Sequence, residues 1–231
     1  MDSLTHGRIA ELLTRLHQEA DAADRPMKEQ IMAAIAASGK SLEAFFAEKI
    51  ATDKKDYKAS LGGLAERFLA VSPAYGSFLY NCARAARATR IIEFGTSMGI
   101  STIYLAAALR DNGGGHLIGS EIEPSKVERA KANIEAAGLS DLVDIRQGDA
   151  METLRDTGSE VDLLMLDGAF PLYLPVLKLV EPKLRVGAFI LAENALDRDY
   201  LDYVRYPANG YLSQPVTLDA PRGNEVTVRT V

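Results

Sequence analysis

The sequence predicts an α/β fold in which a doubly wound parallel sheet follows a helical amino-terminal extension. The main observation is that apolar strand-like runs alternate with helical segments from Arg90 onward, which is typical of a parallel sheet with helices on both faces. The residues before position 89 contain helical patterns and no convincing strand. Two final strand-like runs, 210–219 and 224–231, are separated by a short turn-like stretch and predict an antiparallel hairpin.

The extension is expected to contain three helices, and a fourth precedes the first strand. The first helix has Ser3 as its candidate N-cap, and the second begins at Pro26, a residue suited to the first helical position. Gly39 would end the second helix, and residues 41–55 form the third. The fourth helix begins with Ser72 as the N-cap before a proline.

The remaining elements follow from short apolar runs for strands and amphipathic segments for helices. The expected parallel strands are 90–95, 116–122, 142–149, 161–168 and 187–194. The expected helices are 100–111, 124–138, 150–156 and 171–184. Within this set, Pro124 opens the second helix and Gly138 closes it.

The composition is that of an ordinary globular protein. Of the 231 residues, 47% are hydrophobic and 25% are charged, which suffices for one large domain or a domain with an extension. The net charge of -6 argues against a protein devoted to nucleic-acid backbones. The single cysteine, Cys82, excludes an intrachain disulfide framework. Because there is no signal-peptide pattern and no apolar run near about 18 residues, we expect a cytoplasmic protein without a membrane span.

Three acidic residues stand at the ends of three successive predicted strands. Glu93 precedes a turn that contains Gly95 and Gly99, while Glu121 ends the second strand and Asp149 ends the third. In open α/β sheets, ligands bind at the carboxyl ends of the strands. Two glycines alone would indicate only a tight turn, but the added acids favour a ligand. An acid in the place of Glu121 can accept hydrogen bonds from both ribose hydroxyls of an adenosine.

The turn differs from a dinucleotide-binding loop in two respects. Ser97 stands where that loop has its middle glycine, and the position of its third glycine is Ser101 or Thr102. Glu93 would repel a pyrophosphate but would favour a cationic group. The ligand should therefore combine an adenosine with a cationic end, and S-adenosylmethionine fits this description.

In these motifs and in their order, residues from about 70 to 231 resemble the class I S-adenosylmethionine-dependent O-methyltransferases of the catechol and caffeoyl-coenzyme A type. The resemblance rests on "IIEFGTSMGISTIYLA", "GLSDLVDIRQGDA" and "VDLLMLDGAFPLY", in this order. It implies a Rossmann-like seven-stranded sheet of order 3-2-1-4-5-7-6 whose last hairpin is antiparallel. It also implies methyl transfer to a hydroxyl of a small phenolic or catechol-like acceptor by a homodimer. The expected division is a helical extension, 1–70, and a methyltransferase domain, 71–231.

The resemblance assigns the cofactor to the glycine turn, the two following strand ends and the segment before the first strand. The turn would hold the methionine part, Glu121 the ribose, and Asp149 with Ala150 the adenine. The expected cofactor-binding residues are Ser72, Glu93, Gly95, Thr96, Ser97, Gly99, Ser101, Glu121, Ile122, Gly148, Asp149, Ala150 and Asp167.

The resemblance also points to a metal site, with one departure from the family pattern. Asp167 matches one ligand of the Mg²⁺-dependent members, but Glu193 and Asn194 stand where relatives carry an Asp-Asn pair. All three side chains offer hard oxygen ligands, suited to Mg²⁺ or another divalent cation. The longer Glu193 could equally be an acid that faces the pocket without a metal. Asp167 and Glu193 are the candidate catalytic residues, and without a metal either one is a candidate base.

A second departure concerns the acceptor pocket. Relatives often carry a lysine general base three residues after the first metal ligand, and this chain has Phe170 there. Tyr173 matches a frequent family tyrosine. Both rings are candidates for the acceptor pocket, and the alternative for both is a place in the core. The amino-terminal helices would cover the acceptor, form the dimer contact, or both. The charged stretch 53–58 is either solvated or a mobile lid.

Three other functions are compatible with parts of the pattern. RNA methylation would use the basic cluster of Arg84, Arg87 and Arg90, although the negative net charge speaks against it. A dinucleotide-dependent oxidoreductase conflicts with Ser97. A protein that binds S-adenosylmethionine but has weakened catalysis would fit the loss of the lysine.

Overall fold

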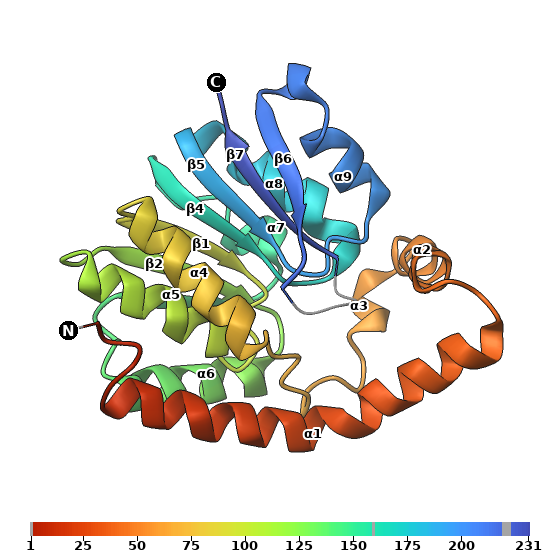
Figure 1. Cartoon of the computed structure of the whole chain (residues 1–231), viewed down its shortest axis with the longest axis horizontal. Coiled ribbons are helices and arrows are strands. Elements are labelled where there is room, and N and C mark those ends of the chain that lie inside the picture. The colour runs from red at the N-terminus through yellow and green to blue at the C-terminus, as the bar shows by residue number, and fades with distance from the viewer. Residues whose placement is uncertain (1, 159, 219–222) are drawn as a thin grey trace.

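The computed structural model describes residues 2–158, 160–218 and 223–231. Its centre is a seven-stranded sheet of order β3-β2-β1-β4-β5-β7-β6 (Figure 1). The pairings among β1 to β5 are parallel, and β7 pairs antiparallel with both β5 and β6. The strands are β1 (Arg90–Phe94), β2 (His116–Glu121), β3 (Val143–Gln147), β4 (Val161–Leu166), β5 (Leu184–Ala192), β6 (Tyr211–Val216) and β7 (Asn224–Arg229). The predicted fold, strand order and antiparallel hairpin are confirmed. The tip of that hairpin lies outside the described residues.

Helices cover both faces of the sheet and create two apolar cores. Alternate residues of each strand point to opposite faces, so Ile91 belongs to one core and Ile92 to the other. The first core includes α4 (Pro73–Ala85), α5 (Ile100–Asp111) and α6 (Pro124–Ala137). The second includes α7 (Ala150–Thr153), α8 (Tyr173–Val180) and α9 (Arg198–Val204).

Predicted helix boundaries hold where a cap fixes them. Ser72 accepts a hydrogen bond from the backbone N–H of Tyr75 at 3.0 Å, which makes Ser72 the N-cap of α4. Gly138 ends α6 in the left-handed conformation, at φ 74°. The helix α9 is not predicted, and the predicted helix 171–184 is shorter because 3₁₀ turns flank α8.

The prediction of two helices before Gly39 is wrong. A single helix, α1 (Arg8–Ser38), contains Pro26 in its interior, and Gly7 rather than Ser3 stands at its N-cap position. Proline lacks the N–H that would continue the helical hydrogen bonds. The nearby carbonyl of Ala23 accepts a hydrogen bond from Arg67. The local signal for a new helix at Pro26 is therefore not followed in the structure.

The second half of α1 leads away from the sheet and forms an arm (Figure 1). The helix α2 (Leu42–Asp53), capped by Ser41, confirms the third predicted helix and lies at the end of this arm. A short helix, α3 (Tyr57–Ser60), returns toward the carboxyl ends of the strands. Within the described part of the chain, no helix is both long and apolar enough to cross a membrane.

Candidate functional site

The loop between β1 and α5 can exist only with glycine at its first position. Gly95 has φ +92°, and a Cβ there would lie 2.3 Å from the carbonyl oxygen of Asp167. The backbone N–H groups of Gly95 and Thr96 donate to the carbonyl of Ser120 at 3.1 and 3.2 Å. The loop is therefore fixed between the ends of β2 and β4, with the amino terminus of α5 behind it.

Glu93 lies beneath this loop. Its carboxylate is fully buried and accepts hydrogen bonds from Thr96 at 3.0 Å, Ser101 at 2.7 Å and Thr102 at 2.5 Å. Burial raises the pKa of Glu93 even though these hydroxyls favour the charged form. Glu93 was expected at the cofactor surface, but the geometry gives it the task of holding the loop from behind.

Glu121, at the end of β2, holds the loop from the other side. One carboxylate oxygen accepts the backbone N–H of Ser97 at 2.8 Å, and the other accepts that of Glu123 at 2.9 Å. Each carboxylate oxygen has a second lone pair that remains suited to a ribose hydroxyl. Glu121 thus combines the predicted ligand position with a structural role that the sequence did not indicate.

Asp149 is tied to the extension by two side chains. It caps α7, and its carboxylate accepts the hydroxyl of Tyr57 at 2.5 Å and lies 3.0 Å from the ammonium of Lys58. Burial opposes the charged form, but the hydrogen bonds from Tyr57 and Lys58 outweigh it and hold the pKa of Asp149 below its usual value. The stretch 53–58 therefore packs over the predicted adenine position.

Lys126 is a buried cation in the same region, and it was not among the site residues predicted from the sequence. Its side chain lines the cleft, is 5% exposed, and donates to the hydroxyl of Ser97 at 3.2 Å. Burial lowers the pKa of Lys126, while the charges of Glu121 and Asp24 act in the opposite direction. A lysine on the first turn of a helix has no local signal that would distinguish it from a solvated one.

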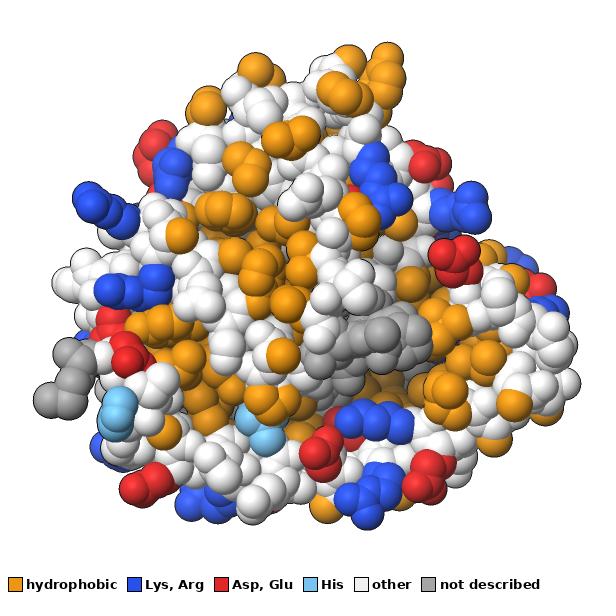
Figure 2. Space-filling view, viewed as in Figure 1, with side chains coloured by type: hydrophobic (Ala, Val, Ile, Leu, Met, Phe, Trp, Pro, Cys, Tyr) orange, Lys and Arg blue, Asp and Glu red, His pale blue; other side chains and the backbone are white. Residues whose placement is uncertain are grey.

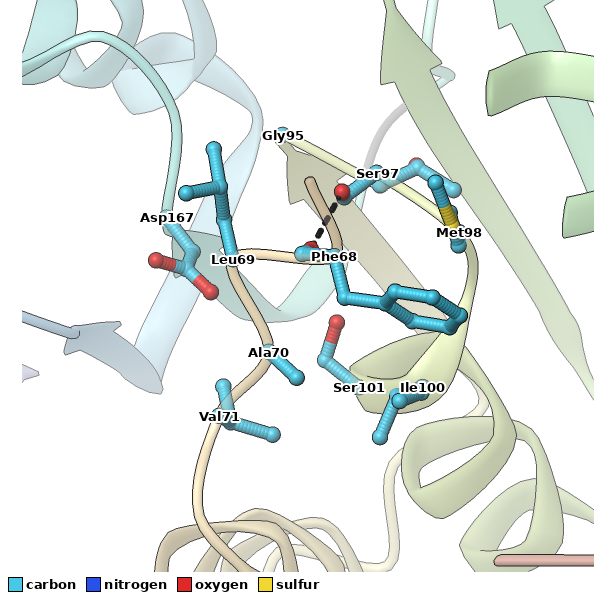
Figure 3. Close-up of a pocket in the computed structure, with 11 residues that line it drawn as sticks. Phe68, Leu69, Ala70, Val71, Gly95, Ser97, Met98, Ile100, Ser101 and Asp167 are labelled. Atoms are coloured by element: carbon cyan, nitrogen blue, oxygen red, sulfur yellow. Dashed lines mark hydrogen bonds between the residues drawn. The ribbon is translucent and has the colours of Figure 1, made fainter. Parts of the chain in front are cut away.

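A buried carboxylate on α1 fixes the segment that crosses the glycine loop. Asp24 is 1% exposed and accepts the backbone N–H groups of Phe68 at 2.9 Å and Leu69 at 2.8 Å. The carbonyl of Phe68 in turn accepts the hydroxyl of Ser97 at 2.6 Å (Figure 3). Leu69 has φ 50°, an uncommon conformation for a residue with a side chain. The extension is thereby part of the predicted methionine site.

Replacing Asp24 with asparagine is expected to lower both stability and affinity for S-adenosylhomocysteine. The amide offers one acceptor oxygen, so a buried N–H would lose its partner at about 1–3 kcal/mol. For a chain of this size, that lowers the melting temperature by about 2–12 °C, and we expect affinity to fall several-fold. Asp21→Asn is the matched control, because Asp21 is exposed on the same helix. Equal melting temperature and affinity in the two variants would refute the role of Asp24.

Most predicted site residues line one cavity of about 640 Å³ between the sheet and the α1–α2 arm. The predicted residues that line it are Gly95, Ser97, Glu121, Ile122, Gly148, Asp149, Ala150, Asp167, Phe170, Glu193 and Asn194. Thr96 and Ser101 line a small adjoining pocket beside Phe68 (Figure 3). Ser72, Glu93, Gly99 and Tyr173 line neither space.

Tyr173 was expected in the acceptor pocket, but it lies in the core. Its ring is fully buried against Phe94 and Tyr200, and its hydroxyl donates to the carbonyl of Glu193 at 2.6 Å. Phe170 does line the cavity, and its ring packs edge-on against Phe46 of α2 with centroids 6.3 Å apart. Tyr173 therefore supports the end of β5, while Phe170 belongs to the cavity wall.

The oxygen groups predicted to hold a metal occupy adjacent strand ends. Asp167 follows β4, and Glu193 and Asn194 follow β5; all three line the cavity. The side-chain amide of Asn194 donates its N–H to the carboxylate of Glu193 at 2.6 Å, so the amide oxygen of Asn194 takes no part in this hydrogen bond. Among the described residues, no three His, Cys, Asp or Glu side chains form a cluster that could hold a metal. A site here would rest on two carboxylates and an amide, a donor set that suits a hard cation.

The hydroxyl of Tyr75 adds a polar group near the acids. It is buried and lacks a hydrogen-bond partner among the described residues. Burial, followed by the charges of Glu193 and Asp167, raises the pKa of Tyr75 well above its usual value. Tyr75 lines neither the cavity nor the small adjoining pocket, and its side chain belongs to the first apolar core.

The chain is similar to known methyltransferases in sequence and in fold. Residues 92–195 match a family model described as a methyltransferase domain. A catechol O-methyltransferase from Niastella koreensis is 32% identical over 163 residues, which cover 68% of this chain and 73% of that protein. One from Mycobacterium tuberculosis is 33% identical over 129 residues, 55% of this chain and 58% of that protein. The O-methyltransferase TomG from Streptomyces achromogenes, solved with S-adenosylmethionine, has a TM-score of 0.63 and 25% identity over 71% of this chain and 82% of its own.

Proposed function

The chain belongs to the S-adenosylmethionine-dependent O-methyltransferase family, and from this premise we propose that its acceptor is a small phenolic or catechol-like molecule. The observation that carries the proposal is the single cavity that unites two sets of groups. Glu121 and Asp149 stand at the adenosine end, and Asp167, Glu193 and Phe170 stand at the other. An acceptor hydroxyl in this cavity would lie next to the carboxylates and within reach of the cofactor.

Bound S-adenosylmethionine supplies a methyl group on a sulfonium, which an aligned oxygen can displace. For this transfer the chain must orient the cofactor and bring the hydroxyl into line. We assign the ribose to Glu121 and the adenine to Asp149 with Ala150. Ser97 and the segment from Phe68 to Val71 enclose the methionine part, because these residues line the small pocket beside the glycine loop.

The acceptor hydroxyl must also lose its proton. Asp167, Glu193 and Asn194 would hold a divalent cation, and such a cation would stabilise the acceptor oxyanion. Without a cation, Asp167 or Glu193 would accept the proton directly. Phe170 offers no ammonium at the place where relatives often carry a lysine, so the carboxylates bear this task in either case.

A calorimetric titration distinguishes these two mechanisms. Mg²⁺ is titrated into protein stripped with chelator and saturated with S-adenosylhomocysteine, with Asp167→Ala as the control. We expect stoichiometric binding that the variant abolishes. If Mg²⁺ does not bind, the metal assignment is rejected, and single acidic phenols become the first acceptors to screen. If no acceptor is methylated although S-adenosylhomocysteine binds, a weakened cofactor-binding protein is the better description.

Asp167→Ala is expected to reduce methyl transfer to catechol by at least about 100-fold, because it removes either a metal ligand or the base. Affinity for S-adenosylhomocysteine should change by less than about threefold, since Glu121 and Asp149 stay in place. The measurement pairs turnover with calorimetry, and the exposed Asp199→Ala serves as the control. Retained turnover in Asp167→Ala would exclude a catalytic role.

The remaining expectations concern assembly and location. We propose that residues 1–70 serve mainly to cover the acceptor, since helices α1, α2 and α3 contribute to the cavity wall. A homodimer through the α1–α2 arm and a cytoplasmic location remain part of the proposal. Sedimentation of the purified protein tests the dimer. RNA methylation is not favoured, because Arg90 begins β1 at the edge opposite the cavity.

A further inference from the structure

The half of the cavity that faces the arm is apolar. Met27, Ile31 and Ile35 recur every fourth residue and therefore lie on one face of α1, and all three line the cavity. Leu42 and Phe46 of α2 line it as well. These side chains are half-buried, whereas most of their helix neighbours on other faces are exposed. Figure 2 shows apolar side chains gathered beside the hollow, over this arm.

The charged groups around this wall disfavour anions. Among the described residues that line the cavity, seven carboxylates accompany three lysines. Each of these lysines has a partner: Lys28 pairs with Asp21 at 3.5 Å, Lys49 pairs with Asp53 at 2.9 Å, and Lys126 donates to Ser97. An acidic acceptor would enter a cavity of net negative charge in which none of these ammonium groups is uncommitted.

We propose that the acceptor is an uncharged phenol or catechol with a hydrophobic body that packs between α1 and α2, and that the site rejects acceptors with an anionic tail, including coenzyme A thioesters. The inference rests on the proposed function. The reactive hydroxyl lies at Asp167 and Glu193, and the Phe46–Phe170 pair marks where the apolar wall begins. The body of the acceptor extends from there along Ile31 and Ile35.

The test uses the intact protein saturated with S-adenosylhomocysteine. Binding of 4-alkylcatechols with tails of one to six carbons is measured by calorimetry, beside the same series ending in a carboxylate. Burial of each methylene should tighten binding of the neutral series by up to about fourfold. Each carboxylated compound should bind at least about tenfold more weakly than the neutral one of equal length.

Two variants assign these effects to the wall. Ile31→Gln should flatten the dependence of binding on tail length in the neutral series. Ala33→Gln, at an exposed position of α1 outside the cavity lining, is the matched control and should behave as the unaltered protein. Asp53→Asn releases Lys49 and should restore several-fold affinity for the carboxylated series alone.

The outcomes separate the inference from its premise. A neutral series without length dependence, or equal binding of both series, overturns the inference while catechol methylation upholds the proposed function. Ile31→Gln with an unchanged slope also overturns it. If the unaltered protein fails to bind S-adenosylhomocysteine or to methylate any phenol or catechol, the proposed function fails and the inference falls with it.

Discussion

Gly95→Val is expected to abolish binding of S-adenosylhomocysteine and to lower the melting temperature by about 4–20 °C. The left-handed backbone at φ +92° disfavours a side chain by about 1–2 kcal/mol. The new Cβ would also lie 2.3 Å from the carbonyl oxygen of Asp167 and 2.7 Å from Cα of Gly168. Forcing these backbones apart adds about 1–3 kcal/mol. The sum, at about 2–4 °C per kcal/mol, gives the expected shift.

A second glycine separates steric overlap from backbone strain. Gly113 has φ +101°, and a Cβ there would meet nothing within 4 Å. It lies in the turn before β2, at the edge of the sheet opposite the cavity. Gly113→Val should therefore show the strain alone and bind S-adenosylhomocysteine normally. For both variants, thermal unfolding gives the melting temperature and calorimetry gives the affinity for S-adenosylhomocysteine. Normal binding by Gly95→Val would mean that the loop does not approach the cofactor.

The central fold was predictable because local and tertiary signals agree in it. Buried strands such as Val161–Leu166 are mostly apolar runs, and Ser72 and Gly138 mark helix ends by their own hydrogen bonding or backbone conformation. At Pro26 the two kinds of signal conflict. The local preference favours a helix start, but α1 continues through Pro26, and Ala23 and Asp24 before it accept hydrogen bonds from residues 67–69.

In the candidate site, too, some residues could be predicted from the sequence and others could not. Glu121 and Asp149 could be predicted to lie together because parallel strands bring their carboxyl ends to one edge, whereas Asp167 was implied by the family resemblance. Tyr57 and Asp24 reach the same edge from the extension, through side-chain contacts that no spacing encodes. The extension had been expected to cover the acceptor, but nothing in its helical pattern indicated that it also holds Asp149 and the segment beside the glycine loop.

Glu121→Ala is expected to weaken binding of S-adenosylhomocysteine by about 10- to 100-fold. Hydrogen bonds to a charged group contribute about 1.5–3 kcal/mol, which corresponds to this range at about 1.4 kcal/mol per tenfold. The variant removes the proposed ribose acceptor. It also leaves the backbone N–H groups of Ser97 and Glu123 without the carboxylate that accepts their hydrogen bonds in the unaltered protein. Calorimetry on the purified variant measures the affinity.

The neighbouring Glu123→Ala and the conservative Glu121→Gln distinguish ribose binding from support of the loop. Glu123 also lines the cavity, but its carboxylate accepts hydrogen bonds from the backbone N–H and hydroxyl of Ser125, so its loss should change affinity by less than about threefold. Glutamine keeps one acceptor oxygen, so it can hold Ser97 or a ribose hydroxyl but serves both poorly. We therefore expect Glu121→Gln to bind with intermediate affinity and to discriminate less between S-adenosylhomocysteine and its 2′-deoxy analogue. An unchanged affinity in Glu121→Ala would reject the ribose assignment, whereas lost discrimination in Glu121→Gln would support direct contact with the ribose.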